Sequence, residues 1–205
     1  MNFYDDGYKS CDCFWGKEPA GLVKRAVELL TNEKNVHDLR AIDFGCGEGK
    51  NVKYIAEAGI DVVGIDLSEY AIKNARNACL NLKAIFLIAD MRHVSSLDKD
   101  FDLVVSTGSI HCLPLWADVV NVIDNLKKMV ANNGIIVFST FNDRSHDFSG
   151  HPSAFNPILI PHKSYVELFS DMHILHSSDE DLIDIHPNNG IRHQHSITRI
   201  MAKRS

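Results

Sequence analysis

Short apolar runs alternate with segments of helical periodicity from residue 38 to residue 139, and this alternation constrains the fold more than any other feature. The runs are apolar at nearly every position, which is typical of strands covered on both faces of a parallel sheet. Parallel strands need helical crossovers between them, and the intervening segments have the required spacing. The expected strands cover residues 38–44, 61–66, 84–88, 101–106 and 134–139, and the expected helices cover residues 50–58, 68–80 and 115–130.

Further elements are expected on both sides of this alternating region. Before it, residues 19–30 place five apolar side chains on one helical face, and Pro19 suits the first turn. After it, a helix near residues 162–170 and strands near residues 172–177 and 191–202 would complete the sheet. We therefore expect a doubly wound, Rossmann-like α/β fold with a seven-stranded, mostly parallel sheet and helices on both faces.

The length and composition of the chain indicate one globular domain. With 205 residues, of which 45% are hydrophobic and 23% charged, the chain is too short for two ordinary domains. Within a single domain of residues 1–205 we distinguish an amino-terminal segment, residues 1–18, a ligand-binding core, residues 38–140, and a substrate-side region, residues 141–205. Residues 141–161, rich in Asn, Ser, His and Pro, are expected to form a long loop that carries substrate contacts.

Charge and cysteine content limit the expected partners and compartment. The net charge is −6 and Lys and Arg are not clustered, so we expect no nucleic-acid partner. The chain shows neither a secretory signal nor an apolar run long enough to span a bilayer, so we expect no membrane partner. Five cysteines without a framework spacing fit a reducing compartment. We therefore predict a soluble, cytoplasmic protein whose oligomeric state stays open.

A glycine-rich turn follows the first expected strand, in the sequence AIDFGCGEGKN of residues 41–51. Its glycines are Gly45, Gly47 and Gly49, so the third comes one residue earlier than in the dinucleotide fingerprint GxGxxG. Asp43 stands before the turn and Glu48 lies inside it, and two carboxylates disfavour a pyrophosphate at this place. The turn therefore favours a ligand with a positive centre.

Acidic residues also end the next two strands. Asp66, at the end of the second, is placed to accept both hydroxyls of a ribose, and Asp90, at the end of the third, could accept an adenine amino group. Leu67 and Met91 would give apolar contact to the adenine ring. Together with Asp43, these positions describe an adenosine attached to a cationic group without phosphate.

Each of these carboxylates also has a purely structural alternative. Asp43 could satisfy buried N–H groups, Asp66 could cap the helix that starts near Ser68, and Asp90 could close a turn. The ordered set of acids at successive strand ends favours the ligand-binding interpretation.

Four stretches of the chain, D-F-G-C-G-E-G, V-V-G-I-D-L-S, A-D-M and F-D-L-V-V-S, resemble the successive motifs of class I S-adenosylmethionine (SAM)-dependent methyltransferases. The resemblance covers residues 38–140 and implies that the cofactor is S-adenosyl-L-methionine. It implies that Asp43 lies near the methionine ammonium group, that the three glycines let the backbone approach the cofactor, and that Asp66 binds the ribose. Cys46 in the turn and Ser106 at the end of the fourth strand are included among the expected cofactor-binding residues.

The amino-terminal segment carries a second resemblance. F-W-G-K-E-P, residues 14–19, is similar to the W-G-x-x-P entry segment of small-molecule methyltransferases resembling the tellurite-resistance and thiopurine groups. This implies a lid in which Tyr8 and Trp15 close over the cofactor and exclude water, although Trp15 could simply pack under the first helix. It also implies a small-molecule methyl acceptor, for example a thiol or a chalcogen oxyanion, which as a soft nucleophile needs no base.

Two histidines are the candidates for catalysis. His111 follows the fourth strand and could remove a proton from the acceptor or orient it, or it could be a packed histidine before the next helix. His193 and His195 share one face of a strand, which permits two substrate contacts or a metal pair. No third metal ligand is identifiable from spacing, and the close thiols Cys11 and Cys13 lack a second pair, so we predict no metal site.

Two other functions share parts of this pattern. A SAM-binding protein that regulates without transferring methyl groups would have the same pocket motifs. A nicotinamide-dependent oxidoreductase is disfavoured by Asp43, Glu48 and the glycine spacing.

Overall fold

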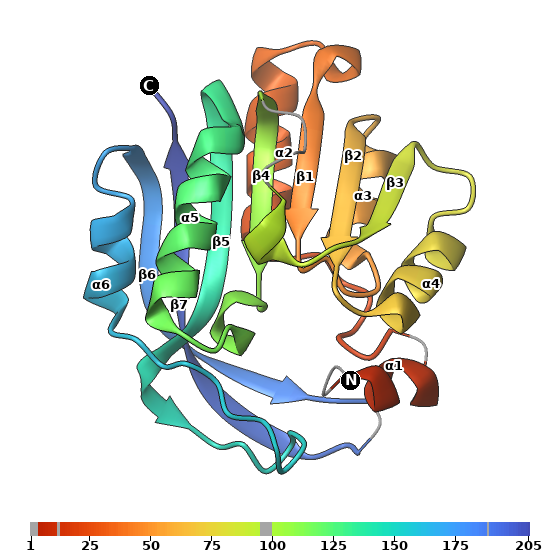
Figure 1. The fold of residues 1–205 in the computed structure, drawn as a ribbon. Coiled ribbons are helices and arrows are strands. Elements are labelled where there is room, and N and C mark those ends of the chain that lie inside the picture. Colours follow the sequence, from red (N-terminus) through yellow and green to blue (C-terminus); the bar gives the residue numbers. More distant parts are fainter. Residues whose placement is uncertain (1–3, 12, 95–99, 188) are drawn as a thin grey trace.

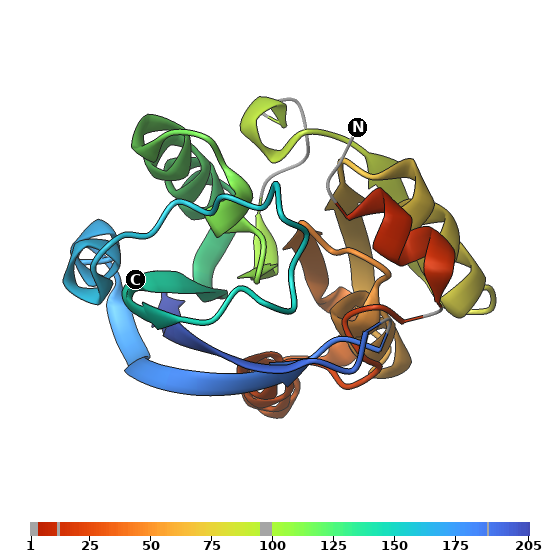
Figure 2. The same ribbon diagram turned by 90° about the horizontal axis from the view of Figure 1, so that it is seen from below.

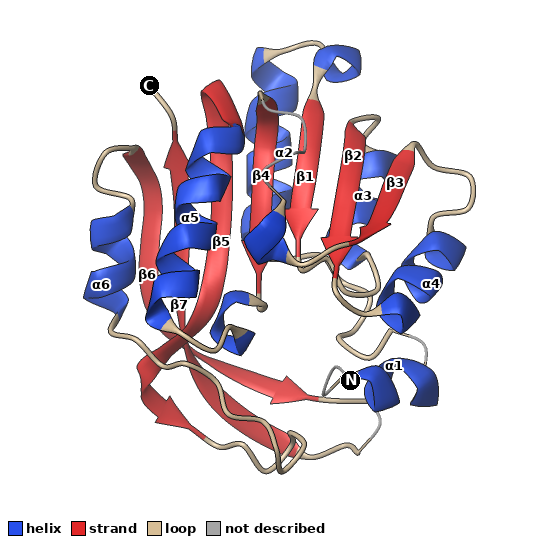
Figure 3. Ribbon diagram, viewed as in Figure 1, coloured by secondary structure: helices blue, strands red, loops and turns tan. Residues whose placement is uncertain are grey.

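In the computed structural model, one seven-stranded sheet runs through the whole molecule, with helices on both of its faces (Figures 1 and 3). The structure describes residues 4–11, 13–94, 100–187 and 189–205, so residues 1–3 and 12 of the expected lid lie outside the described residues. The strand order is β3-β2-β1-β4-β5-β7-β6, and β7 is antiparallel to both of its neighbours. This is the predicted seven-stranded, mostly parallel sheet.

The first strands are parallel and close to their predicted positions. They are β1 (Arg40–Phe44), β2 (Asp61–Asp66), β3 (Ala84–Ile88) and β4 (Phe101–Thr107). The chain proceeds outward from β1 to β3 and then returns to place β4 on the other side of β1. The strand order therefore reverses between β1 and β4, which is where doubly wound sheets bind ligands.

Two apolar cores cover the two faces of the sheet because successive strand residues point to opposite sides. One core packs α2 (Gly21–Glu33), α3 (Lys50–Glu57) and α4 (Glu69–Ala78) on the sheet, and the other packs α5 (Trp116–Met129) and α6 (His162–Leu168). Helix α2 begins after its cap residue Ala20, so Pro19 precedes the first turn instead of occupying it. The short 3-10 helices are η1 (Val36–Asp38), η2 (Met91–His93) and η3 (Ile110–Cys112).

Of the last three strands, the first two are longer than predicted, whereas the third has the predicted length and is displaced by one residue. The three strands are β5 (Val130–His146), β6 (His173–Ile185) and β7 (Arg192–Lys203), and their outer halves form an antiparallel extension beyond the carboxyl edge of the sheet (Figure 1). The prediction that residues 141–161 are all loop is therefore wrong for the first six, which belong to β5; of these, Phe141 and His146 pair with β7. The remaining residues, 147–161, cross the carboxyl edge of the sheet (Figure 2).

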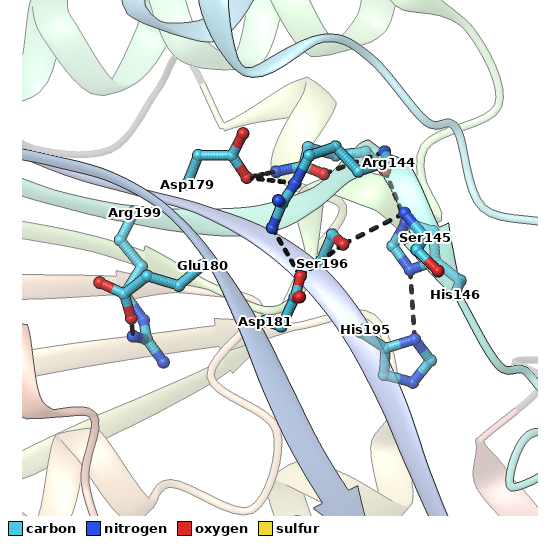
Figure 4. A network of polar contacts seen from close by, with 10 residues as sticks. Arg144, Ser145, His146, Asp179, Glu180, Asp181, His195, Ser196 and Arg199 are labelled. Atoms are coloured by element: carbon cyan, nitrogen blue, oxygen red, sulfur yellow. Dashed lines mark hydrogen bonds and ion pairs between the residues drawn. The ribbon is translucent and has the colours of Figure 1, made fainter.

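The acidic residues of β6 explain why its outer half was not predicted. Residues 178–184 carry four carboxylates and have no apolar run, yet they pair in register with β7. Arg144 of β5 binds Asp179 at 2.8 Å and Asp181 at 2.5 Å, and Arg199 of β7 pairs with Glu180 (Figure 4). These ion pairs come from strands far apart in the sequence, so strand periodicity alone could not reveal them.

Helix α1 (Asp5–Ser10) lies below the carboxyl ends of the parallel strands, opposite the antiparallel extension (Figure 2). None of the helices in the described part of the chain is both long and apolar enough to cross a membrane.

Candidate functional site

A cavity of about 880 Å³ opens at the carboxyl ends of the parallel strands. Its floor is formed by the loops after β1, β2, β3 and β4, and its sides by the amino-terminal segment and by residues of β5, β6 and β7. The cavity therefore lies at the predicted reversal of strand order, between the lid and the antiparallel extension.

The glycine turn contributes Gly45, Cys46 and Gly47 to the cavity wall. All three glycines of the turn have positive φ angles, +70°, +52° and +80°, which favour glycine. A Cβ atom at Gly45 would lie 2.4 Å from Cβ of Ser109, so this position also needs glycine for space. Gly49 does not line the cavity; a Cβ atom there would meet Ala75 and Phe86, so its space is needed for packing.

The backbone N–H groups of the turn are already bonded within the protein. Those of Gly45 and Cys46 both donate to the Ile65 carbonyl at 2.9 Å, and that of Gly47 donates to the Asp66 carboxylate at 2.9 Å. A phosphate cradle needs such N–H groups free to point at the ligand. The turn is therefore unsuited to hold a pyrophosphate in the dinucleotide manner.

Asp43 lies in β1 beneath this turn and is completely buried. Neither of its carboxylate oxygens has a hydrogen-bond partner among the residues that the structure describes. Burial raises the pKa of Asp43 to about 8; the Asn51 side chain opposes this rise, and the nearby Asp66 carboxylate adds to it. Asp43 does not itself line the cavity, and a cation in the cavity would favour its ionised form.

Asp66 ends β2 and lines the cavity. One carboxylate oxygen accepts from the Gly47 N–H and the other from the Ser68 N–H, both at 2.9 Å. Burial raises the pKa of Asp66, and these backbone donors oppose the rise. The cap of α4 is the Ser68 hydroxyl, which accepts from the Ala71 N–H, so Asp66 is not needed as the cap.

Asp90, Leu67 and Met91 also line the cavity. The carboxylate of Asp90 accepts from the Arg92 N–H at 2.9 Å and pairs with the Arg92 guanidinium at 2.5 Å, and this side-chain contact lowers its pKa. The alternative that Asp90 closes a turn is thus realised at the start of η2. Leu67 is largely exposed in the cavity mouth, at 59%, which leaves an apolar surface that a ring could cover.

The amino-terminal segment forms one side of the cavity, as expected of a lid. The Trp15 indole N–H donates to the Tyr8 hydroxyl at 2.9 Å, and both side chains line the cavity. The Trp15 ring also lies against Tyr4, Phe14 and His186.

Two residues near the glycine turn hold this segment in place. The Glu48 carboxylate accepts from the backbone N–H groups of Cys13, at 3.1 Å, and of Phe14. It also accepts from the Asn74 amide at 2.9 Å, while Lys50 donates to the Trp15 carbonyl at 2.8 Å. Sequence reasoning treated Glu48 as a charge facing the ligand, and the structure shows that its main partners are the lid.

Ser106 and His111 differ in their access to the cavity. Ser106 is fully buried and does not line the cavity; its hydroxyl lies 3.3 Å from that of Ser109, which does. His111 lines the cavity, stacks on Phe141 with ring centroids 3.9 Å apart, and has Nδ1 3.4 Å from the Thr140 hydroxyl. Burial lowers the pKa of His111 to about 3, so the imidazole is neutral at physiological pH.

His193, the second histidine predicted to act in catalysis, does not line the cavity. It is 3% exposed and lies in a group of histidines behind the aromatic side of the cavity. Phe141 and Phe155, which lie within the region 141–161 expected to carry substrate contacts but were not named individually, line this side, as does Asp184. They belong to strands or loops of unpredicted geometry, and no motif marks them.

A family model described as a methyltransferase domain matches residues 42–138. Among curated proteins, the putative methyltransferase YqeM of Bacillus subtilis (strain 168) is 31% identical over 126 residues, which cover 54% of this chain and 51% of that protein. The chain spans about half the length of the curated relatives it matches.

Solved structures with the same arrangement of strands and helices cover nearly the whole chain. TehB from Haemophilus influenzae gives a TM-score of 0.75 at 19% identity, over 91% of this chain and 62% of that one. A chain from a structure described as "Conversion of a Disulfide Bond into a Thioacetal Group during Echinomycin Biosynthesis" gives 0.70 at 20% identity, over 98% and 91%. At these identities the likeness concerns the fold.

Proposed function

We propose that the protein methylates a small-molecule acceptor with SAM as donor, because residues 42–138 match a methyltransferase domain and the chain has the fold of class I SAM-dependent methyltransferases. The observation that carries the proposal is the buried carboxylate of Asp43, which has no partner among the described residues and lies beneath a turn whose N–H groups are occupied. Such a site suits a cationic ligand without phosphate.

The residues around the cavity divide into roles that follow from their positions. Asp43 neutralises the positive charge of the methionine end, and Asp66 accepts the ribose hydroxyls with the lone pairs that Gly47 and Ser68 leave free. Leu67 and Met91 cover the adenine. SAM supplies a methyl group on a sulfonium sulfur.

The lid and His111 act on the acceptor side of the cavity. Tyr8 and Trp15, joined by a hydrogen bond, exclude water from the reacting centre. The neutral imidazole of His111 is a weak base, so its role is to orient the acceptor through a hydrogen bond. Its Nδ1 is near Thr140 and its ring plane is fixed by stacking on Phe141.

We infer that the acceptor atom is a soft nucleophile, such as the sulfur of a thiol. The side of the cavity near His111 carries the aromatic rings of Phe141, Phe155 and Trp15, and an apolar surface suits a small organic thiol more than a strongly hydrated oxyanion. A thiolate attacks a methyl sulfonium without needing a base at the moment of reaction, which fits a neutral His111.

Two measurements test the proposal in sequence. Calorimetric titration with SAM, S-adenosylhomocysteine and NADH should show binding of the first two only; failure of SAM to bind at millimolar concentration would contradict the methyltransferase assignment. Asp43→Asn should weaken SAM binding, whereas the control Asp61→Asn, at the exposed start of β2, should not.

A measurement of turnover then distinguishes a methyltransferase from a regulatory SAM-binding protein. We expect formation of S-adenosylhomocysteine, followed by mass spectrometry, when SAM is mixed with a panel of small thiols, selenite and tellurite. Turnover with phenols or amines alone would overturn the choice of a soft nucleophile. Tight SAM binding without turnover on any acceptor class would favour a regulatory SAM-binding protein.

A further inference from the structure

Five side chains of metal-ligating types lie together beside the aromatic side of the cavity, and the proposed methyl transfer uses none of them. His151 comes from the loop of residues 147–161, Asp184 lies near the end of β6 and also lines the cavity, His186 follows β6, and His193 and His195 lie at the start of β7. Candidate ligand atoms of His151, His193 and His195 lie within 4.8 Å of one another, as do those of Asp184, His186 and His193.

Two imidazole nitrogens in this cluster have no partner among the described residues. His193 is 3% exposed and His186 is 1% exposed, and in each the Nε2 atom is buried without a hydrogen bond. The Nδ1 atom of His193 lies 2.8 Å from the Ile191 carbonyl and must donate to it, so Nε2 carries the lone pair. In metal-binding histidines, one ring nitrogen commonly donates a hydrogen bond that fixes the ring, and the other nitrogen keeps a lone pair for the metal. His193 has this arrangement.

The hydrogen-bond network also directs a lone pair of His195 into the cluster. Nε2 of His146 lies 2.6 Å from the Asn142 carbonyl and must donate to it, so Nδ1 of His146 is an acceptor. Nδ1 of His195 lies 3.2 Å from that acceptor (Figure 4) and therefore donates to it. Nε2 of His195 is then an acceptor, and it faces Nε2 of His151.

His151 supplies the third nitrogen. Its Nε2 lies 2.9 Å from Nε2 of His195, and its Nδ1 lies 3.5 Å from the Tyr4 hydroxyl. If the ring proton of His151 sits on Nδ1 and faces the Tyr4 oxygen, its Nε2 lone pair joins those of His193 and His195. A tetrahedral zinc site with Zn–N bonds of ~2.0–2.1 Å has its nitrogens about 3.3 Å apart, which side-chain rotations of these rings can reach.

We propose that His151, His193 and His195 form a binding site for a divalent transition-metal ion of the zinc type, with a fourth position open. Imidazole nitrogens suit such ions, and three histidines with an open position are a known ligand set for zinc. Candidate ligand atoms of Asp184 and His186 also lie within 4.8 Å of one of His193. The ion joins the loop of residues 147–161 to β7.

This link bears on the acceptor side of the cavity. The same loop donates from the Ile158 N–H to the His111 carbonyl at 2.8 Å and places Phe155 in the cavity wall. The ring of His151 stacks on Phe155 with centroids 4.6 Å apart. A metal at this site therefore fixes the wall against which the acceptor lies.

The test uses the full chain with any affinity tag removed and with metal stripped by a chelator. Titration with zinc chloride alone, followed by calorimetry, should show about one ion per chain at the three-histidine site. His193→Ala and His195→Ala should each weaken zinc binding at least ~10-fold, as expected when a ligand is lost. His173→Ala removes an exposed histidine at the far end of β6 and is the matched control, with zinc affinity unchanged.

Two further measurements test the metal site even if the strand variants fail to fold. His151→Ala changes a half-buried loop residue, so it should fold even if the strand variants do not, and it should also weaken zinc binding at least ~10-fold. Cobalt(II) bound in place of zinc should give the intense visible absorption of a four-coordinate site. The proposal is overturned if the folded wild type binds no zinc, if His151→Ala binds it as tightly as the wild type, or if cobalt shows only the weak spectrum of an adventitious, hydrated ion.

Discussion

The side of the cavity formed by β1–β4 consists of strand ends and short turns, whereas the side formed by the extensions of β5–β7 consists of side chains gathered from distant segments. On the first side, Asp43, the glycine turn and Asp66 lie within 24 residues of one another in the sequence. On the second, His111, Phe155 and Asp184 come from a 3-10 helix, a loop and a strand. The donor side is thus specified locally, and the acceptor side by tertiary contacts.

The largest effect should come from a change in the glycine turn on the donor side. Gly45→Ala would place a Cβ atom 2.4 Å from Cβ of Ser109 at a φ of +70°, so clash and backbone strain add. We expect a loss of about 2–5 kcal/mol in the free energy of unfolding and no measurable SAM binding. Urea denaturation and calorimetry measure the two effects.

A control variant separates the cost of the backbone strain from the cost of the steric clash with Ser109. Gly190→Ala has a similar φ of +65° and no atom within 4 Å of the new Cβ, so it should cost only about 1 kcal/mol. The double variant Gly45→Ala with Ser109→Gly should regain part of the lost stability. Equal losses at Gly45 and Gly190 would show that the Ser109 contact is unimportant.

A second variant should affect turnover without affecting the cofactor. His111→Ala removes the ring that orients the acceptor, so we expect kcat to fall by ~10–100-fold while SAM affinity stays within about 3-fold. Steady-state kinetics and calorimetry check the two values, and His162→Ala, which lies away from the cavity, is the control. Unchanged turnover on the true acceptor would remove His111 from the mechanism.

In contrast to His111→Ala, the variant Asp66→Asn should lower the affinity for the cofactor. The amide keeps one acceptor oxygen but places an NH2 group against the Gly47 or Ser68 N–H, so we expect SAM binding to weaken by ~1–3 kcal/mol. Once SAM is saturating, kcat should be nearly restored. Unaltered affinity in this variant would contradict the ribose assignment.

The pH dependence of SAM binding is a finer probe of the donor side. The carboxyl group of Asp43 has its pKa raised to about 8, so it is protonated in the ligand-free protein at neutral pH. A cationic ligand favours the carboxylate, so SAM affinity should rise by up to ~10-fold per pH unit between about pH 6 and about pH 7.5. Asp43→Asn should bind weakly with little pH dependence across this interval.

The raised pKa of Asp43 also predicts how the stability of the ligand-free protein depends on pH. A raised folded-state pKa stabilises the protein fully below the unfolded-state value of 3.8, and this contribution is lost as the pH rises through about 8. Thermal melts of the ligand-free wild type should therefore show declining stability over this interval, and Asp43→Asn should decline less. Parallel curves for the two proteins would show that Asp43 does not titrate as described.

The contrast between the two sides also explains what could be predicted from the sequence. Strands β1–β4 are apolar runs followed by turns, so their positions and the acids at their ends follow from periodicity. The outer half of β6 has four carboxylates in seven residues, and Arg144 and Arg199 bind three of them from β5 and β7. Likewise His151 lies more than forty residues from His193, so no spacing marked it as a third ligand.

The smallest predicted effect concerns the lid, whose main anchor is Glu48. Glu48→Gln would turn an amide NH2 group toward the N–H groups of Cys13 and Phe14, so one of these bonds is lost. Because the lid keeps its contacts through Trp15 and Tyr8, we expect SAM affinity to fall only ~2–5-fold, while tryptic cleavage after Lys17 becomes faster. Glu57→Gln, on the exposed side of α3, should change neither quantity. If cleavage after Lys17 proceeds at the wild-type rate in Glu48→Gln, the lid is held by its aromatic contacts alone, and the donor side of the cavity depends on tertiary packing more than its local motifs indicate.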